Sequence, residues 1–222
     1  MTQITATYID SMGSDLSVVN AARVSFGKQS EWEEQVHPSG DYADNVLSDR
    51  DVKLIHYLAK HKHISPFGHA FASFHVKSPI FVARQLVKHK FLRWNEISRR
   101  YCDDNIEFYT PEEWRGRSAD KKQGSEGVVD VGDWGDSNWA CLKTYNDLLE
   151  HGVAPEQARM ILPQSTMTEW YWSGSLDAFA AMCRLRCASD TQYETRIVAD
   201  QISEEMGKLF PVSWSALMEG VE

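Results

Sequence analysis

Basic side chains gather between Arg84 and Tyr101, in the part of the sequence best suited to chemistry. These eighteen residues, RQLVKHKFLRWNEISRRY, contain six lysines and arginines and one acid, Glu96, so the local charge is +5. The whole chain has a net charge of −9, which leaves −14 for the rest. A basic run is often only a solvated face, but Gln85 and Ser98 place amide and hydroxyl groups among these cations. The pattern therefore favours a binding site for an anion.

The same segment resembles the signature of the flavin-dependent thymidylate synthase family. Lys88–Lys90 reads KHK and is followed, after seven residues, by Ser98, where the family has Arg-His-Arg, seven residues and Ser. Gln85 before the signature and Asn95–Ser98 at its end also match. Lysine keeps the charge of the two replaced arginines but loses their planar, bidentate fork. Phosphate or flavin contacts tolerate that change better than a stacking or bidentate contact does.

Further segments resemble the same family. His63–Phe67 (HISPF) is similar to a flavin-contacting segment, and Ala158–Pro163 (ARMILP) is similar to a segment whose arginine binds the nucleotide. The Leu185–Arg186 pair, followed by Gln192, Tyr193 and Glu194, resembles a family motif whose arginine polarises the pyrimidine. Ser175 and Ala181 stand where many relatives have asparagines that touch the adenine of the flavin.

The resemblance covers about residues 12–211 and implies a complete reaction. This reaction is the reductive methylation of dUMP to dTMP, with FAD as hydride and carbon relay, NADPH as reductant and methylenetetrahydrofolate as carbon donor. Arg186 is implied as the catalytic residue. The residues implied for dUMP are Gln85, Lys88, Glu96, Ser98, Arg99, Arg100, Arg159 and Arg186. The residues implied for FAD are His63, Ser65, Lys88, His89, Lys90, Glu96 and Ser175. Arg23, in a further family-like segment, is a candidate without an assigned role.

The side-chain chemistry agrees with this reaction. Charge-assisted donors suit a nucleotide phosphate, and the basic run supplies them. A uracil ring needs amide and guanidinium partners, for which Gln85 and Arg186 are candidates. Nucleophilic attack on the ring is not indicated, because no cysteine has a context that lowers its pKa. Ser98 has no histidine beside it in sequence to act as a base, so we assign it to a phosphate or backbone contact.

Two other functions remain open. One is a related flavoenzyme that modifies dCMP or transfers hydroxymethyl, because base choice depends on a few hydrogen bonds. The other is a single-stranded nucleic-acid binder that stacks bases on Phe91, Trp94 and Tyr101, although the charge of −14 elsewhere argues against it. No metal site is predicted, since the five histidines from His61 to His89 fit no zinc-ligand spacing.

The bulk composition is that of a soluble globular protein. Of 222 residues, 42% are hydrophobic and 25% are charged, and no apolar run reaches the roughly 20 residues of a membrane span. The first residues lack the basic and apolar regions of a secretory signal. Four scattered cysteines do not form a disulfide framework, which indicates a cytoplasmic protein. We expect no membrane partner and no general nucleic-acid binding.

Periodicity and end signals predict the elements that must position these residues. Alternating side chains predict strands over 3–9, 70–76 and 166–172. Capping and apolar spacing predict helices that begin at Asp15, Ser48, Pro79, Asp136, Pro155, Leu176 and Ile197. The helix from Pro79 is predicted to reach residue 90, and the last helix to end before Pro211. Residues 27–47, 91–101 and 102–135 are predicted as loops, the second of them functional.

No repeat or linker divides the chain, so residues 1–222 are predicted to form a single domain. The family resemblance implies an α+β fold with a mixed β-sheet flanked by helices. It also implies a homotetramer whose active sites lie between subunits.

Overall fold

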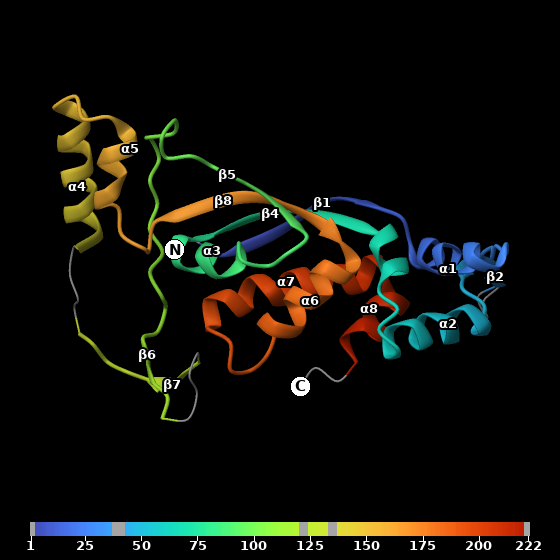
Figure 1. Ribbon diagram of the computed structural model, residues 1–222. Helices are drawn as coiled ribbons and strands as arrows, with labels where there is room; N and C mark the ends of the chain where they lie inside the picture. The colour runs from blue at the N-terminus through green and yellow to red at the C-terminus, as the bar shows by residue number, and fades with distance from the viewer. Residues whose placement is uncertain (1–2, 37–42, 120–123, 133–136, 220–222) are drawn as a thin grey trace.

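The computed structural model describes residues 3–36, 43–119, 124–132 and 137–219 (Figure 1). Its main sheet has four strands in the spatial order β1 (Thr5–Met12), β4 (Phe71–Pro79), β8 (Met167–Ser175) and β5 (Leu92–Glu96). Each neighbouring pair of these strands is antiparallel. The predicted α+β class is confirmed, but this sheet is antiparallel where a mixed sheet was expected, because the chain reverses direction between every two neighbours.

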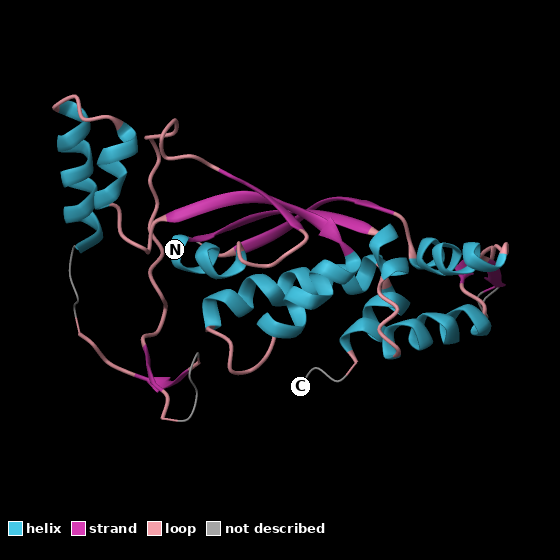
Figure 2. Cartoon of the chain, in the orientation of Figure 1, coloured by secondary structure: helices cyan, strands magenta, loops and turns pink. Residues whose placement is uncertain are grey.

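Three helices cover one face of the sheet: α3 (Ile80–Leu86), α6 (Leu176–Arg186) and α7 (Tyr193–Leu209) (Figure 2). Alternate residues of the central strands point to that face and form the core. Phe74 and Trp172 lie edge-to-face on Phe179 of α6. Trp94 of β5 extends this layer by stacking on Trp170, with ring centroids 4.1 Å apart.

Different helices lie at the two ends of the sheet (Figure 1). Helices α1 (Asp15–Arg23) and α2 (Asp49–Lys60) are at the end where β8 finishes, and α4 (Ser137–Glu150) and α5 (Pro155–Ala158) are at the end where β8 starts. The remaining elements are η1 (Val24–Phe26), β2 (Glu33–Val36), β3 (Ala43–Val46), η2 (Ser65–His69), β6 (Arg115–Arg117), β7 (Ser125–Val128), η3 (Arg159–Ile161) and α8 (Pro211–Met218).

The predicted strands and most predicted helices are confirmed, including the cap at Ser48, whose hydroxyl accepts from the Asp51 N–H at 3.2 Å. The start predicted at Asp136 lies outside the described residues. Among those described, no helix is both long and apolar enough to cross a membrane.

The helix predicted over 79–90 is wrong at its C-terminal end. It stops at Leu86, and the chain then turns through Phe91, which adopts a positive φ of 66°, into strand β5. The loop predicted over 91–101 therefore contains a strand. Pairing with β8 requires this reversal, and the tertiary hydrogen bonds outweigh the local helical pattern.

The other predicted loops also contain strands. The segments predicted as loops over 27–47 and 102–135 each hold a short antiparallel pair, β2–β3 and β6–β7. The chain continues beyond Leu209 in α8, because Pro211 occupies a first-turn position that needs no N–H donor.

Candidate active site

A basic cavity of about 450 Å³ lies where β5 ends and β8 begins. Five of the residues predicted for dUMP line it: Glu96, Ser98, Arg99, Arg100 and Arg159. The strand β5 delivers Glu96 to this cavity, and the Ile97 N–H still bonds to the Glu169 carbonyl at 2.9 Å. The chain then turns, with the N–H groups of Tyr101 and Cys102 both 3.0 Å from the Ser98 carbonyl. Pairing with β8 thus holds the start of the turn, which carries three of the five side chains.

The charges of this cavity favour an anion. Both oxygens of Glu96 already accept hydrogen bonds, from Thr168 Oγ1 at 2.6 Å and from Trp94 Nε1 at 3.0 Å. The Arg100 Nε donates to Ser98 Oγ at 3.2 Å, so the hydroxyl and the guanidinium face the same place. Arg99 bonds to the carbonyl of Asp104 at 2.9 Å, but its Nε is buried without a partner among the described residues. An unpaired buried donor is costly unless a ligand accepts from it.

Gln85 lies apart from this cavity, at the end of α3. Its Nε2 donates to Gln192 Oε1, and its Oε1 accepts from Thr195 Oγ1 at 3.3 Å. The amide is thus held by residues at the start of α7, which the sequence analysis did not assign to the site.

Arg186 occupies the last position of α6 and donates from Nε to His89 Nε2 at 3.0 Å. Burial and the Arg186 charge lower the pKa of His89 to about 4, so the imidazole is neutral at physiological pH. Burial also lowers the pKa of Arg186 itself. Within the described part of the chain no carboxylate pairs with Arg186, and its positive charge remains available to a substrate.

His63 and Ser65 line a different cavity, of about 830 Å³, between η1, α2 and η2. Arg23 also lines it, but its guanidinium is paired with the buried Asp51. The hydrogen bond from Arg23 is a main reason that the pKa of Asp51 is lowered despite its burial. Arg23 is thus committed to a structural ion pair.

The cations that remain available in this cavity were missed by the sequence analysis. They are Lys28, Arg50 and Lys53, none of which has a partner among the described residues. Arg50 and Lys53 are three apart on α2, so they share a face, and this spacing was the available signal. Tyr57, one turn further along α2, adds an aromatic ring that stacks on His63 at 6.2 Å.

Four other predicted flavin residues line neither cavity: Lys88, His89, Lys90 and Ser175. Lys88 and Lys90 are exposed in the turn between α3 and β5. Ser175 is buried, with 9% of its surface exposed, and it ends β8 opposite Phe71. The described part of one chain therefore gathers only part of the predicted flavin site.

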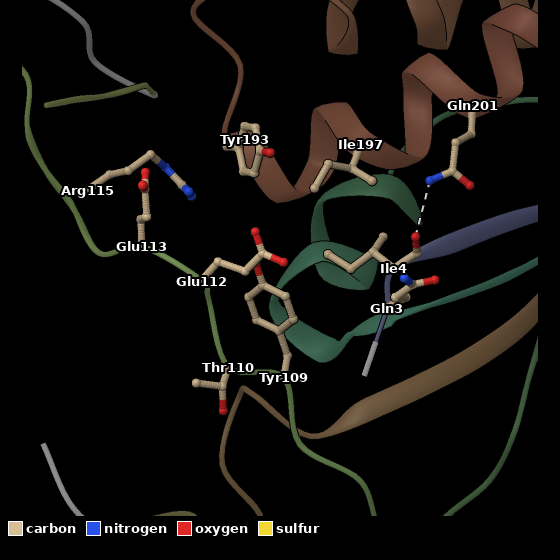
Figure 3. A pocket seen from close by; sticks show the side chains of 10 residues that line it. All are labelled: Gln3, Ile4, Tyr109, Thr110, Glu112, Glu113, Arg115, Tyr193, Ile197 and Gln201. Atoms are coloured by element: carbon tan, nitrogen blue, oxygen red, sulfur yellow. Dashed lines mark hydrogen bonds between the residues drawn. The ribbon is translucent and has the colours of Figure 1, made fainter. Parts of the chain in front are cut away.

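A further cavity, of about 510 Å³, lies between the segment that leads into β6 and the start of α7 (Figure 3). Tyr109 reaches it from that segment and Arg115 from the first position of β6, and the Arg115 guanidinium lies 4.4 Å from the centre of the Tyr193 ring. At its other side Gln201 Nε2 donates to the Ile4 carbonyl at 3.1 Å. Neither this cavity nor its residues were predicted from the sequence.

The geometry also bears on base stacking, on thiol attack and on metal binding. Trp94 is stacked on Trp170 and bonded to Glu96, so it is not available to stack bases. Cys183 is fully buried, and burial raises the pKa of its thiol, which makes it a poor nucleophile. Within the described ranges, no three histidine, cysteine or acidic side chains converge as a metal site would require.

Comparisons with known proteins agree with these features. Residues 7–212 match the family model described as thymidylate synthase complementing protein. The chain is 38% identical over 219 residues to a flavin-dependent thymidylate synthase of Thermus thermophilus. The aligned region covers 95% of this chain and 74% of that protein. It is 37% identical over 218 residues to that of Kosmotoga olearia, with 95% and 88% covered. The chain belongs to the flavin-dependent thymidylate synthase family.

Solved structures place the fold of this synthase among nucleotide methylases. The UMP/dUMP methylase PolB of Streptomyces cacaoi bound with 5-Br dUMP has a TM-score of 0.76 and 31% identity, over 98% of this chain and 95% of that one. The same protein bound with 5-Br UMP has a TM-score of 0.79 and 29% identity, over 100% and 96%. The predicted family, enzyme class and flavin dependence are confirmed.

The strand register of the synthase separates the two groups of predicted residues. Strand β5 runs from Leu92, opposite Gly174, to Glu96, opposite Trp170, so the basic cavity lies where β8 begins. His63 and Ser65 precede β4, whose first residue pairs with the last residue of β8. Because β4 and β8 have nine residues each, the two groups stand at opposite ends of a strand about 30 Å long.

Proposed function

We propose that this synthase converts dUMP to dTMP, with FAD as its flavin, methylenetetrahydrofolate as the carbon donor and NADPH as the reductant. The observation that carries the proposal is the basic cavity at the end of β5, where Ser98 and three arginines surround about 450 Å³. The structural neighbours described as UMP/dUMP methylases were solved with brominated uridine nucleotides, and this supports a uridine nucleotide as the substrate.

The basic cavity is suited to the phosphate of the nucleotide. The Ser98 hydroxyl, Arg100 and the unpartnered Nε of Arg99 supply neutral and charged donors, and Arg159 adds a further exposed guanidinium. Charge-assisted bonds of this kind are about twice as strong as neutral ones. Glu96, whose oxygens are occupied by Thr168 and Trp94, serves to shape the cavity and repels the phosphate from its own edge.

Arg186 is the residue we propose to act on the pyrimidine. Its charge is partly buried and faces a neutral imidazole, so it is not neutralised by the protein. A guanidinium in this state stabilises negative charge that develops on a carbonyl oxygen of the ring. His89 holds the guanidinium in place by accepting from Nε and leaves the two terminal nitrogens free for the substrate.

The cavity of about 830 Å³ fits a flavin dinucleotide by its donor set. Lys28, Arg50 and Lys53 would hold the pyrophosphate, and Tyr57 offers a ring for stacking. His63 and Ser65 add polar contacts, as the family resemblance implies. Bound FAD supplies the hydride and one-carbon chemistry, and the protein binds, orients and polarises the nucleotide.

We further propose that the protein, a single domain over residues 1–222, works as a cytoplasmic homotetramer with sites between subunits. A reduced flavin has to meet the uracil ring, yet the two groups of residues lie at opposite ends of β4 and β8. Contact between the start of β8 in one subunit and the end of β8 in another would bring them together. The free thiols of Cys102, Cys141, Cys183 and Cys187 agree with a reducing compartment.

The test is the visible spectrum and the product of the purified protein. We expect near-stoichiometric FAD, a change of the flavin spectrum on addition of dUMP, and dTMP identified by mass spectrometry only when methylenetetrahydrofolate and NADPH are both present. Parallel reactions with UMP and dCMP distinguish the related activities. A protein that takes up no FAD, or that methylates another nucleotide and leaves dUMP unchanged, would contradict the proposal.

A further inference from the structure

Glu194 is a buried carboxylate for which the proposed reaction provides no role. It lies in the first turn of α7 with 4% of its surface exposed. One oxygen, Oε1, is paired with Arg115 and lies 3.5 Å from the Tyr109 hydroxyl. The other, Oε2, accepts from Gln192 Nε2 at 3.2 Å. Burial of a carboxylate costs desolvation free energy, which these partners offset. A charge kept at this cost points to a role for Glu194 in the site.

The partners of Glu194 are themselves held in place. Arg115 also donates from Nε to Ser125 Oγ at 2.9 Å and lies over the Tyr193 ring. Tyr109 remains a protonated donor, because burial and the Glu194 charge raise its pKa to about 12. Figure 3 shows Tyr109, Arg115 and Tyr193 directed into the space between the segment before β6 and the start of α7. The position of the Glu194 carboxylate is therefore fixed by side chains from the region around β6 and from the start of α7.

A carboxylate can only accept hydrogen bonds, whereas a glutamine amide has one donor end and one acceptor end. Glu194 therefore dictates that Gln192 turns its Nε2 inward. The Oε1 of Gln192 is then left to accept from Gln85 Nε2. The Oε1 of Gln85 in turn accepts from the Thr195 hydroxyl at 3.3 Å. The carboxylate thus sets the direction of every hydrogen bond in the series from Glu194 through Gln192 to Gln85.

We propose that Glu194 is a positioning residue that fixes, through Gln192, the direction in which the Gln85 amide is presented to the nucleotide. This inference rests on the proposed function, which assigns Gln85 to dUMP. One N–H of Nε2 and one lone pair of Oε1 are already hydrogen-bonded inside the protein. Gln85 therefore presents its second N–H and its second lone pair to the nucleotide in a fixed orientation. An amide that is free to turn would present the wrong group to the substrate for part of the time.

The experiment is a double-mutant cycle on the affinity for dUMP, measured by isothermal titration calorimetry on flavin-saturated protein. The four proteins are the parent, Glu194→Gln, Gln85→Ala and the double variant. Glu194→Gln keeps the shape but can donate, so it removes the fixed order. We expect Gln85→Ala to raise the Kd for dUMP about tenfold and Glu194→Gln about fivefold. In the Gln85→Ala background, Glu194→Gln should change the Kd by less than about twofold.

A structural role for Glu194 predicts a different result. If Glu194 only anchors the segment around β6, its substitution should raise the Kd for dUMP by the same factor with and without the Gln85 side chain. That outcome would overturn the inference. An unchanged Kd in either single variant would overturn it as well. If Glu194→Gln fails to fold, Gln192→Ala carries the same cycle, because it removes the middle link and leaves the Arg115–Glu194 pair intact.

The two proposals fail in distinguishable ways. A flavin-saturated parent that does not bind dUMP would overturn the proposed function together with this inference. A parent that binds dUMP and makes dTMP, with additive effects in the cycle, would overturn the inference alone. The affinity for FAD serves as the control and should stay within about twofold of the parent in all four proteins.

Discussion

At the scale of single residues, the charge of Arg186 is the feature most directly tied to turnover. A hydrogen bond to a charged group contributes about 1.5–3 kcal/mol, which corresponds to roughly 10–100-fold in rate. We expect Arg186→Ala to lower kcat/KM for dUMP by at least that range and leave FAD content and Tm near the parent. Arg186→Lys should recover only part of the loss, since an ammonium lacks the fork.

Arg184 provides the matched control for this experiment. It lies in the same turn of α6 and, like Arg186, lines neither candidate cavity, but its Nη1 donates to the Leu217 carbonyl at 3.0 Å and is thus occupied by the protein. Arg184→Ala should therefore leave kcat/KM for dUMP within about twofold of the parent. Equal losses in the Arg184 and Arg186 variants would assign both arginines to stability alone.

His89 makes the stability of the protein depend on pH in a defined window. Its pKa is about 4 in the folded chain against 6.5 for a free imidazole. Above pH 6.5 both states are neutral at this position, and as the pH falls towards 4 the unfolded chain gains a proton that the folded chain does not. The free energy of unfolding should therefore decrease over that range. Urea titrations at pH 7.5 and 5 should show a smaller decrease for His89→Gln, whose Oε1 can still accept from Arg186.

At the scale of elements, the pairing of β5 with β8 requires a glycine. A Cβ on Gly174 would overlap the Leu92 side chain and lie 3.0 Å from the Phe91 carbonyl. We expect Gly174→Ala to push β5 away and to lower the free energy of unfolding by about 1–3 kcal/mol. Binding of dUMP should weaken too, because β5 carries Glu96. Gly68→Ala is the control, since nothing lies within 4 Å of its added Cβ; equal unfolding midpoints for the two variants in urea would contradict the close contact.

The elements that could be predicted from the sequence are those that carry their own pattern. From Thr168 to Gly174, strand β8 alternates buried side chains with more exposed ones, and α2 begins with a capping serine and has an apolar stripe. Strand β5 has the sequence LRWNE, which alternates apolar and polar residues only from Leu92 to Asn95, a run too short to mark a strand by itself. Its hydrogen bonds come from the backbone, which any sequence supplies, and its partner β8 lies more than 70 residues away. Local pattern carries no information about such pairings.

At the scale of the whole molecule, the two ends of the sheet predict complementation between subunits. His63→Ala/Ser65→Ala should impair one end, and Arg100→Ala/Arg159→Ala the other. Each variant alone should be nearly inactive. Co-expressed in equal amounts, they form some sites with both intact ends, and random mixing restores about a quarter of the parent activity if each site joins two subunits. Activity no higher than in the separate variants would show that each site lies within one chain.

The candidate site could be predicted from sequence only as a set of motifs. Ser98, Arg100 and Arg159 were assigned to the nucleotide from their motifs, and the fold brings them to one cavity. Lys88 and Lys90 were assigned to the flavin, yet they are exposed and line neither of the two candidate cavities. In the proposed assembly a second subunit would complete the site of these lysines, and motif spacing does not reveal such a requirement. Glu194 belongs to the family-like motif after Arg186, but the sequence assigned it no role, because its partner Arg115 lies 79 positions away.

The stacked indoles of Trp94 and Trp170 have an optical consequence. Two such chromophores at 4.1 Å and nearly parallel are close enough for their electronic transitions to couple. Coupling of the strong indole transitions should give the protein a paired positive and negative band in its far-ultraviolet circular dichroism, and this band should vanish when β5 detaches from β8. The nucleotide end of the sheet therefore carries its own spectroscopic reporter, which can be read without flavin, substrate or label.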